Sequence, residues 1–332
     1  MPITYDPEKR WWVEAAGANP EWVENFRPTL VTFLGFDRDR IPQQVGTGFI
    51  IAVEPQFALA ISAKHVFSEG VLRAQRPVPG HALSALIIHR LDSIPSVEPD
   101  HLKVVWMGKD AGAMLNVVHI NYNDTLDVAA CILMPQKEES ISQRVSIPLD
   151  TTDPSVGDVV HMVTMEEMDV KELNPPQDPS GKGQEISVSR RVSVRIGVVT
   201  ELYPKGFRQY RWPCFTTSIP AKPGMSGGFV YLPRQGMTIA ACGIVCADNS
   251  TDEAQRDFFR CGESVIASAW PALSLQIPLT LPHYPDTRTY TLFEMIRIGH
   301  VPQPVGGIEH INIVESDGGN CFIGKTTLRG SK

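Results

Sequence analysis

The sequence predicts an all-β protein that consists of two packed, antiparallel, six-stranded β-barrels, with short N-terminal helices and a C-terminal extension. Short apolar runs with the composition of strands recur along most of the 332 residues. Proline, glycine and aspartate separate these runs, as is typical of antiparallel β structure. The runs form two sets, which are divided by a polar segment near Pro148 to Gly157. Two sets of about six strands indicate two barrels.

The first residues carry a different pattern. Residues 7–27 predict one or two short helices that are broken between Gly17 and Pro20, because glycine and proline both interrupt helices. We therefore assign residues 1–35 to an N-terminal helical extension and residues 36–150 to the first barrel. The strand-like runs up to the end of this barrel are 28–35, 44–53, 56–62, 83–90, 102–107, 114–120 and 127–133.

The second barrel is expected within residues 151–279. A polar stretch from Glu166 to Glu185 predicts a loop that is inserted into this barrel. Residues 280–332 then form a C-terminal extension of unknown role. The strand-like runs of the second set are 158–165, 187–201, 208–218, 228–232, 237–247 and 257–261.

Composition and charge exclude several classes of function. The chain has 30 basic and 37 acidic residues, a net charge of −7, so it lacks the basic footprint of proteins that bind nucleic acid or anionic membranes. The longest apolar stretch, Val265 to Leu281, is interrupted by serine, proline, glutamine and threonine, which is wrong for a membrane span. The start of the chain lacks the pattern of a secretion signal. Together with six cysteines, this predicts reduced thiols and a cytoplasmic protein.

Two of the cysteines have a spacing that could be read as half of a metal site. Cys242 and Cys246 are four residues apart in a strand-like run, so the alternation of a strand would place both on one face. A zinc site needs further ligands, and no second pair is near. We therefore predict core thiols, and expect no metal and no cofactor.

The most informative segment is Pro223-Gly-Met-Ser-Gly-Gly228. A serine with glycine two residues before it and two glycines after it lies on a tight turn with little side-chain bulk, which exposes its hydroxyl. The main-chain N–H groups of Gly224 and Ser226 could then point at one small volume, as an oxyanion hole requires. Because serine alone is a poor nucleophile, a base and an orienting acid are also needed.

Both partners have candidates upstream of the serine. His65 stands where a strand-like apolar run that begins at Phe57 ends, and is the candidate base. Asp127 directly precedes the apolar run that ends at Leu133, and is the candidate acid. Asp124 is the main alternative for the acid, but Asp127 is favoured because the apolar run follows it directly.

These segments resemble the signatures of the trypsin/chymotrypsin-like serine peptidases. Ile61-Ser-Ala-Lys-His65-Val is similar to their Thr-Ala-Ala-His motif, and Asp127-Val-Ala-Ala-Cys-Ile-Leu to their Asp-Ile-Ala-Leu-Leu motif. Gly224-Met-Ser226-Gly-Gly is similar to their Gly-Asp-Ser-Gly-Gly motif, and the chain order His, Asp, Ser is theirs. Segments at 46–51, 194–200, 223–230 and 243–247 resemble the bacterial high-temperature-requirement-like branch. The resemblance covers roughly residues 40–275, and no PDZ pattern follows it.

The resemblance implies a chymotrypsin-like fold and a serine endopeptidase that cleaves protein or peptide substrates through an acyl-enzyme. His65 and Asp127 would belong to the first barrel and Ser226 to the second, which would end in a C-terminal helix. The specificity pocket would have Pro220 at its base. Its wall would be formed by Cys246, Ala247 and Asp248. Since no acid occupies the base, we expect a small or medium apolar P1 side chain.

Two other motif matches lack the sequence context that their chemistry requires. Gly-x-Ser-x-Gly is also the nucleophile elbow of α/β-hydrolases, but that elbow needs a following helix and a later histidine. Here Gly227 onward predicts a turn and then a strand, and His283, His300 and His310 have no acid motif beside them. The run 319–326 satisfies the Walker A pattern, but a P-loop needs a helix after it, so we predict a strand-forming or flexible tail.

Two alternative functions stay open. The first is a module of trypsin fold that binds a peptide or a protein partner with little or no turnover. The second is a protease that its terminal extensions regulate, which leaves room for a regulatory protein partner. The physiological substrate, the oligomeric state and the resting activity do not follow from the sequence.

Overall fold

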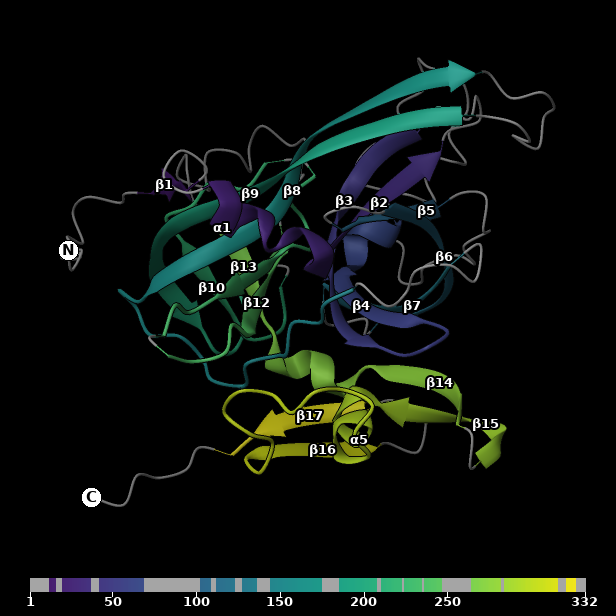
Figure 1. Cartoon of the computed structure of the whole chain (residues 1–332). Helices are drawn as coiled ribbons and strands as arrows, with labels where there is room; N and C mark the ends of the chain where they lie inside the picture. The colour runs from purple at the N-terminus through teal and green to yellow at the C-terminus, as the bar shows by residue number, and fades with distance from the viewer. Residues whose placement is uncertain are drawn as a thin grey trace, which may run out of the picture.

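The structure is a computed structural model of the whole chain. It describes residues 12–15, 20–36, 42–68, 102–108, 112–122, 127–135, 144–174, 185–207, 210–222, 224–234, 236–246, 264–281, 284–315 and 321–326. The fold is all-β, with two closed six-stranded antiparallel barrels and a few short helices, as predicted (Figure 1). Within these residues, no helix is long and apolar enough to cross a membrane.

The first barrel closes in the strand order β2-β3-β4-β7-β6-β5. Every neighbouring pair is antiparallel, and the predicted run 83–90 lies outside the described residues. The strands are β2 (Leu30–Phe36), β3 (Pro42–Val53), β4 (Ala58–Ala63), β5 (Leu102–Met107), β6 (Gly112–Tyr122) and β7 (Val128–Pro135).

The second barrel repeats this order as β8-β9-β10-β13-β12-β11, and β11 also pairs with β8, so that the sheet closes. In both barrels the first three strands are adjacent, and the last three follow in reverse order. The predicted run 257–261 lies outside the described residues, and the sixth strand is β13. The strands are β8 (Val159–Asn174), β9 (Glu185–Tyr203), β10 (Cys214–Thr217), β11 (Phe229–Tyr231), β12 (Ala241–Cys246) and β13 (Ser264–Ser268).

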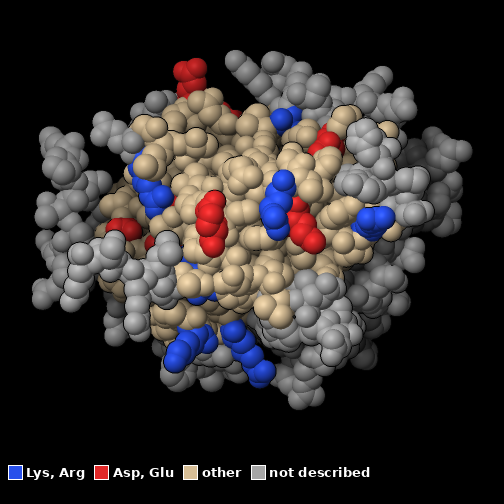
Figure 2. Space-filling view, turned by 90° about the horizontal axis from the view of Figure 1, so that it is seen from below, with Lys and Arg blue, Asp and Glu red and all other residues tan. Residues whose placement is uncertain are grey.

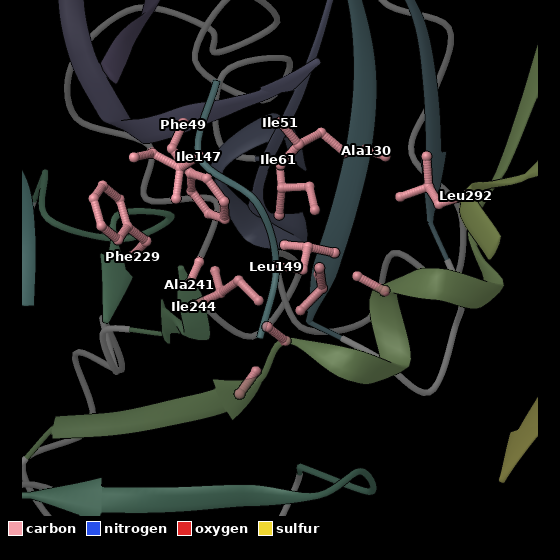
Figure 3. Packing of buried hydrophobic residues seen from close by; sticks show 14 of the residues in the cluster. Phe49, Ile51, Ile61, Ala130, Ile147, Leu149, Phe229, Ala241, Ile244 and Leu292 are labelled. Atoms are coloured by element: carbon pink, nitrogen blue, oxygen red, sulfur yellow. The ribbon is translucent and has the colours of Figure 1, made fainter. Parts of the chain in front are cut away.

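Each barrel has its own apolar interior, and a third apolar cluster lies between the barrels. In Figure 3, Phe49, Ile61 and Ala130 of the first barrel face Phe229 and Ile244 of the second. Full burial of an isoleucine or phenylalanine side chain contributes about 1.5–3 kcal/mol. This cluster therefore fixes the two barrels against each other, so that residues from both can build one site.

The bulge in β12 corrects one expectation. Cys242 packs in the interior of the second barrel, whereas Cys246 packs in the cluster between the barrels. The pairing of β11 with β12 shifts by one residue between Val230 and Tyr231, and such a bulge reverses the faces of the residues beyond it. The two thiols are therefore buried and free, but they do not share a face.

The described half of the segment predicted as a polar loop, residues 166–174 and 185, belongs to a β-ribbon. Strands β8 and β9 pair far beyond the barrel, and the ribbon passes over the first barrel (Figure 1). Residues 175–184, the other half of the predicted loop, lie outside the described residues. Arg190 of β9 is buried under this ribbon, where its guanidinium donates to Thr32 Oγ1 and, at 3.0 Å, to the carbonyl oxygen of Val105. Tertiary contacts with the first barrel thus stabilise strands in a segment whose polar composition predicted a loop.

The N-terminal region packs against the second barrel. It contains β1 (Val13–Glu14), which pairs with β9, helix α1 (Pro20–Glu24) and the 3-10 turn η2 (Arg27–Thr29). The boundary predicted at residue 35 is wrong, because β2 begins at Leu30 and belongs to the first barrel. One short strand and a five-residue helix thus stand where the sequence predicted one or two helices.

The C-terminal region lies beneath both barrels (Figure 1). The predicted C-terminal helix is replaced by a 3-10 turn and a strand, since Pro271 and Pro278 oppose a longer helix, and the boundary predicted at 279 falls inside that strand. Acidic and basic side chains are interspersed on the face seen from below (Figure 2). The elements are η4 (Trp270–Ser274), β14 (Gln276–Leu281), β15 (Tyr284–Thr291), α5 (Leu292–Arg297), β16 (Ile311–Glu315) and β17 (Cys321–Lys325).

The Walker A-like run forms strand β17 over most of its length. Lys325 Nζ donates to the Thr151 carbonyl oxygen and to Asp153 Oδ2, each at 2.7 Å. The lysine therefore joins the extension to the second barrel instead of projecting from a loop. On the other side of the extension, His300 Nδ1 lies 2.7 Å from Glu54 Oε1 of the first barrel.

A partly buried histidine under helix α1 gives the fold a predictable pH dependence. His161 Nδ1 lies 2.8 Å from Tyr231 Oη, and burial lowers the pKa of His161 from 6.5 to about 4. Between these two pKa values, His161 binds a proton in the unfolded chain but not in the folded chain. The free energy of unfolding should therefore fall as the pH decreases from about 6.5 towards 4. Urea unfolding at several pH values measures this slope. The slope should be smaller in His161→Gln; an unchanged slope would assign the acid sensitivity to other groups.

Candidate active site

His65 and Asp127 come together because the strands before and after them are paired. Antiparallel strands β4 and β7 align Ala63 with Val128. His65 lies in the helical turn that follows β4, at residues 64–68, and Asp127 directly precedes β7. The Lys64 N–H donates to the Asp127 carbonyl oxygen at 3.1 Å, which joins the two ends further.

The carboxylate of Asp127 contacts His65 with both oxygens. Asp127 Oδ1 accepts from the His65 main-chain N–H at 3.0 Å, and Oδ2 lies 2.7 Å from His65 Nδ1. A carboxylate only accepts hydrogen bonds, so Nδ1 carries the proton of a neutral imidazole and the basic lone pair is on Nε2. The side chains are 19% and 16% exposed, so the pair is shielded but not sealed from solvent.

The Ser226 turn is held by strand β3 of the other barrel. Thr47 Oγ1 and Gln44 Nε2 donate to the Gly224 carbonyl oxygen at 2.9 and 3.1 Å. The Thr47 N–H donates to the Ser226 carbonyl oxygen at 2.8 Å. Gly224 has φ +90° and Gly227 has φ +84°, a region in which side chains are strained. Glycines therefore allow the turn, and the first barrel fixes it.

The same turn lies directly against the end of β4. A Cβ on Gly227 would collide with Ser62 Oγ and with the Thr47 carbonyl oxygen. A Cβ on Gly46 would collide with Val66, the neighbour of His65, and would lie 3.0 Å from the Ser226 carbonyl oxygen. The main chain of Ser226 and the helical turn of His65 are thus neighbours across the interface between the barrels.

The reactive groups of the turn are not engaged by the described parts of the chain. Ser226 is fully buried, and its Oγ has no hydrogen-bond partner among the described residues, His65 included. Within the same residues, the N–H groups of Gly224 and Ser226 donate to no carbonyl oxygen. The structure thus joins His65 to Asp127 and places the Ser226 main chain near Val66, the residue after His65, without a serine–histidine hydrogen bond.

Two of the four predicted pocket residues can be located. The Pro220 carbonyl oxygen accepts from Arg195 Nη1 at 2.9 Å. Cys246 Sγ lies 3.8 Å from the Asp127 carbonyl oxygen, and burial, reinforced by the Asp127 charge, raises the pKa of this thiol well above its usual value. Cys246 is therefore a neutral packing group beside Asp127. Ala247 and Asp248 lie outside the described residues.

Three side chains that hold the turn were not identified from the sequence. Thr47 and Gln44 bind the Gly224 carbonyl oxygen, and Arg195 binds Pro220. Each is a polar residue inside a strand-like run, which is the signal that could have found them. That signal does not name the partner, because each partner lies 25 or more residues away in the sequence.

The comparisons with known proteins do not identify a function. No family model and no curated protein matches the chain. Solved structures do match, among them one titled "Structure of GrC", with 13% sequence identity and a TM-score of 0.40 over 73% of this chain and 89% of that chain. A likeness this low supports no statement about activity. Among the described residues, no three His, Cys, Asp or Glu side chains gather as metal ligands.

Proposed function

We propose that the protein is a serine endopeptidase with Ser226 as nucleophile, His65 as general base and Asp127 as the group that orients the imidazole. The observation that carries this proposal is the double contact between Asp127 and His65, in which Nδ1 carries the proton and Nε2 is basic. The proposal is further supported by the Ser226 turn, which lies against the end of the strand that leads to His65, and by the Ser226 Oγ, which has no hydrogen-bond partner among the described residues.

The proposed reaction is acyl transfer. Ser226 Oγ attacks the peptide carbonyl carbon while His65 Nε2 takes the hydroxyl proton, and Asp127 stabilises the resulting imidazolium. The imidazolium returns the proton to the leaving amine, the C–N bond breaks and an acyl-enzyme remains. Water then attacks the ester with His65 as base, and Ser226 is released. The N–H groups of Gly224 and Ser226 would hold the oxyanion, and loss of one such donor costs about 3 kcal/mol in the transition state.

The proposed substrates are proteins or peptides with a small or medium apolar P1 side chain. Pro220 would form the base of the pocket and the buried, neutral Cys246 part of its wall, so the base carries no acid that would receive a basic side chain. Cleavage profiles on a peptide library measure this preference. A strong preference for arginine or lysine at P1 would contradict it.

One observation favours the alternative of a binding module with little turnover. Ser226 is fully buried and has no hydrogen bond to His65. Such a resting geometry also occurs in enzymes whose catalytic contacts tighten only when substrate binds. The two functions therefore differ in the reactivity of the serine, not in the fold.

A fluorophosphonate reagent tests the proposal, because it phosphonylates only an activated serine. We expect one label per chain, located on Ser226 by mass spectrometry of peptides, and none in Ser226→Ala. Ser193 offers a matched control, since its hydroxyl is also buried without a hydrogen-bond partner among the described residues. Ser193→Ala should label like the wild type. A folded wild type that stays unlabelled would favour the binding module instead.

A further inference from the structure

A buried arginine contacts both sides of the segment that leads to the proposed nucleophile. Arg195 of β9 is 1% exposed. Its Nη1 donates to the Pro220 carbonyl oxygen at 2.9 Å and lies 3.3 Å from the Met225 sulfur. Met225 directly precedes Ser226. Arg195 thus connects the residue expected at the base of the pocket with the residue before the serine.

The arginine is balanced by one buried carboxylate. Arg195 Nη2 lies 2.9 Å from Glu166 Oε2, and the Glu166 side chain is 6% exposed. A buried ion pair is a poor source of stability, because apolar residues of the same volume often replace it without loss. The role of this ion pair is to fix geometry, because a planar guanidinium holds several acceptors in one arrangement. The acceptors that it fixes belong to the Ser226 segment.

The N-terminal strand covers this pair. Strand β1 aligns Glu14 with Arg195, and the guanidinium carbon lies 5.2 Å from the centre of the Trp12 ring. The Glu14 carboxylate accepts from Arg191, whose Nη2 lies 3.8 Å from Glu166 Oε2. Trp12 therefore places an aromatic face over Arg195. Glu14 holds Arg191, a second positive charge near Glu166.

The end of the N-terminal region, near Phe26, packs against the strand that leaves the Ser226 turn. The ring of Phe26, just after helix α1, lies 5.9 Å from the ring of Phe229. Phe229 begins β11, directly after Gly228 of the serine segment. The chain before residue 30 thus contacts both the entry to the turn, through Arg195, and the exit from it, through β11.

We propose that Arg195 is a positioning residue for Ser226, and that strand β1 with Trp12 completes its setting. Arg195 holds Pro220 and Met225, which limits rotation of the intervening peptide groups and so fixes the N–H groups of Gly224 and Ser226. The reactivity of the serine then depends on the N-terminal strand. This inference rests on the proposed hydrolase function for its catalytic consequence, but the restraint of the turn can be measured without activity.

The test compares Arg195→Met with Arg190→Met. Arg190 is the matched control, because it is also a buried guanidinium on β9 but contacts Thr32 and Val105 of the first barrel instead of the Ser226 segment. The maximal rate constant for phosphonylation of Ser226 is measured at a temperature where thermal unfolding shows both variants to be folded. Displacement of a reacting group by about 1 Å costs about a hundredfold. We expect such a loss for Arg195→Met, and a change of less than about twofold for Arg190→Met.

Amide hydrogen exchange of residues 224–228 supplies the readout that does not need activity. Exchange there should be faster in Arg195→Met than in Arg190→Met, and Arg195→Lys should restore part of the protection and of the rate. Unchanged exchange and an unchanged rate in folded Arg195→Met would overturn the inference. If the wild type is unreactive but exchange is faster in Arg195→Met, the hydrolase proposal is contradicted. The role of Arg195 in restraining the turn is then still supported.

Trp12→Ala keeps the inference testable even where Arg195→Met fails to fold. Trp12 is 38% exposed, so its loss should lower the melting temperature less than the loss of the buried Arg195 does. A cation–π contact of this kind corresponds to about a threefold effect. We expect the phosphonylation rate to fall by about that factor. A rate equal to that of the wild type would contradict the role of the N-terminal strand.

Discussion

Asp127→Asn should lower the turnover number about 10⁴-fold while the fold stays intact. The His65 main-chain N–H donates to Asp127 Oδ1, so this site must remain an oxygen, and the asparagine nitrogen is directed at Nδ1. An amide nitrogen donates, so Nδ1 must become the acceptor and Nε2 must carry the proton. The imidazole would then present a proton, not a lone pair, to Ser226. Steady-state cleavage of a peptide from the substrate profile measures the loss.

Asp150→Asn is the matched control for this change. Asp150 is a buried carboxylate that accepts from the Thr152 N–H at 2.8 Å and pairs with Arg234 at 3.2 Å, and within the described residues its side chain contacts no histidine in a hydrogen bond or ion pair. Its turnover number should stay within about twofold of the wild type, because only a partly exposed ion pair is weakened. Equal turnover of Asp127→Asn and wild type would remove Asp127 from the mechanism and reopen the choice of acid.

The sequence allowed the barrels to be predicted because their strands are defined by local patterns. The apolar runs at 44–53, 102–107 and 127–133 correspond closely to β3, β5 and β7. Such runs bury one face or both, and short polar segments between them leave little choice but antiparallel neighbours. The candidate residues His65 and Asp127 were placed at the ends of two such runs, and the pairing of those strands then brings them together.

The parts that could not be predicted depend on contacts distant in sequence. The ribbon of β8 and β9 is polar and lacks a strong strand pattern, and the first barrel supports it through Arg190. Strand β1 has only two residues and exists because β9 offers it an edge. The bulge at Cys242 is set by the pairing with β11 and leaves no signal in the sequence. The same holds for Arg195, whose role follows from what it touches.

Gly227→Ala should destabilise the protein by at least about 3 kcal/mol, because a positive φ and a steric collision act together. Gly227 has φ +84°, and an added Cβ would collide with the Thr47 carbonyl oxygen and Ser62 Oγ. The carbonyl oxygen belongs to β3 of the first barrel and cannot move without displacing that strand. The turn must therefore withdraw from the first barrel, which carries Ser226 away from His65 and removes reactivity even where the chain still folds.

Gly236→Ala separates these two causes. Gly236 also has a positive φ, +72°, but no described atom lies within 4 Å of an added Cβ. Its substitution should cost only the conformational strain of about 1 kcal/mol and leave phosphonylation of Ser226 unchanged. Urea unfolding gives both free energies, and the difference between the variants is the cost of forcing the barrels apart at the serine turn. Equal destabilisation by the two substitutions would show that the close contact between the barrels is not what holds Ser226 in place.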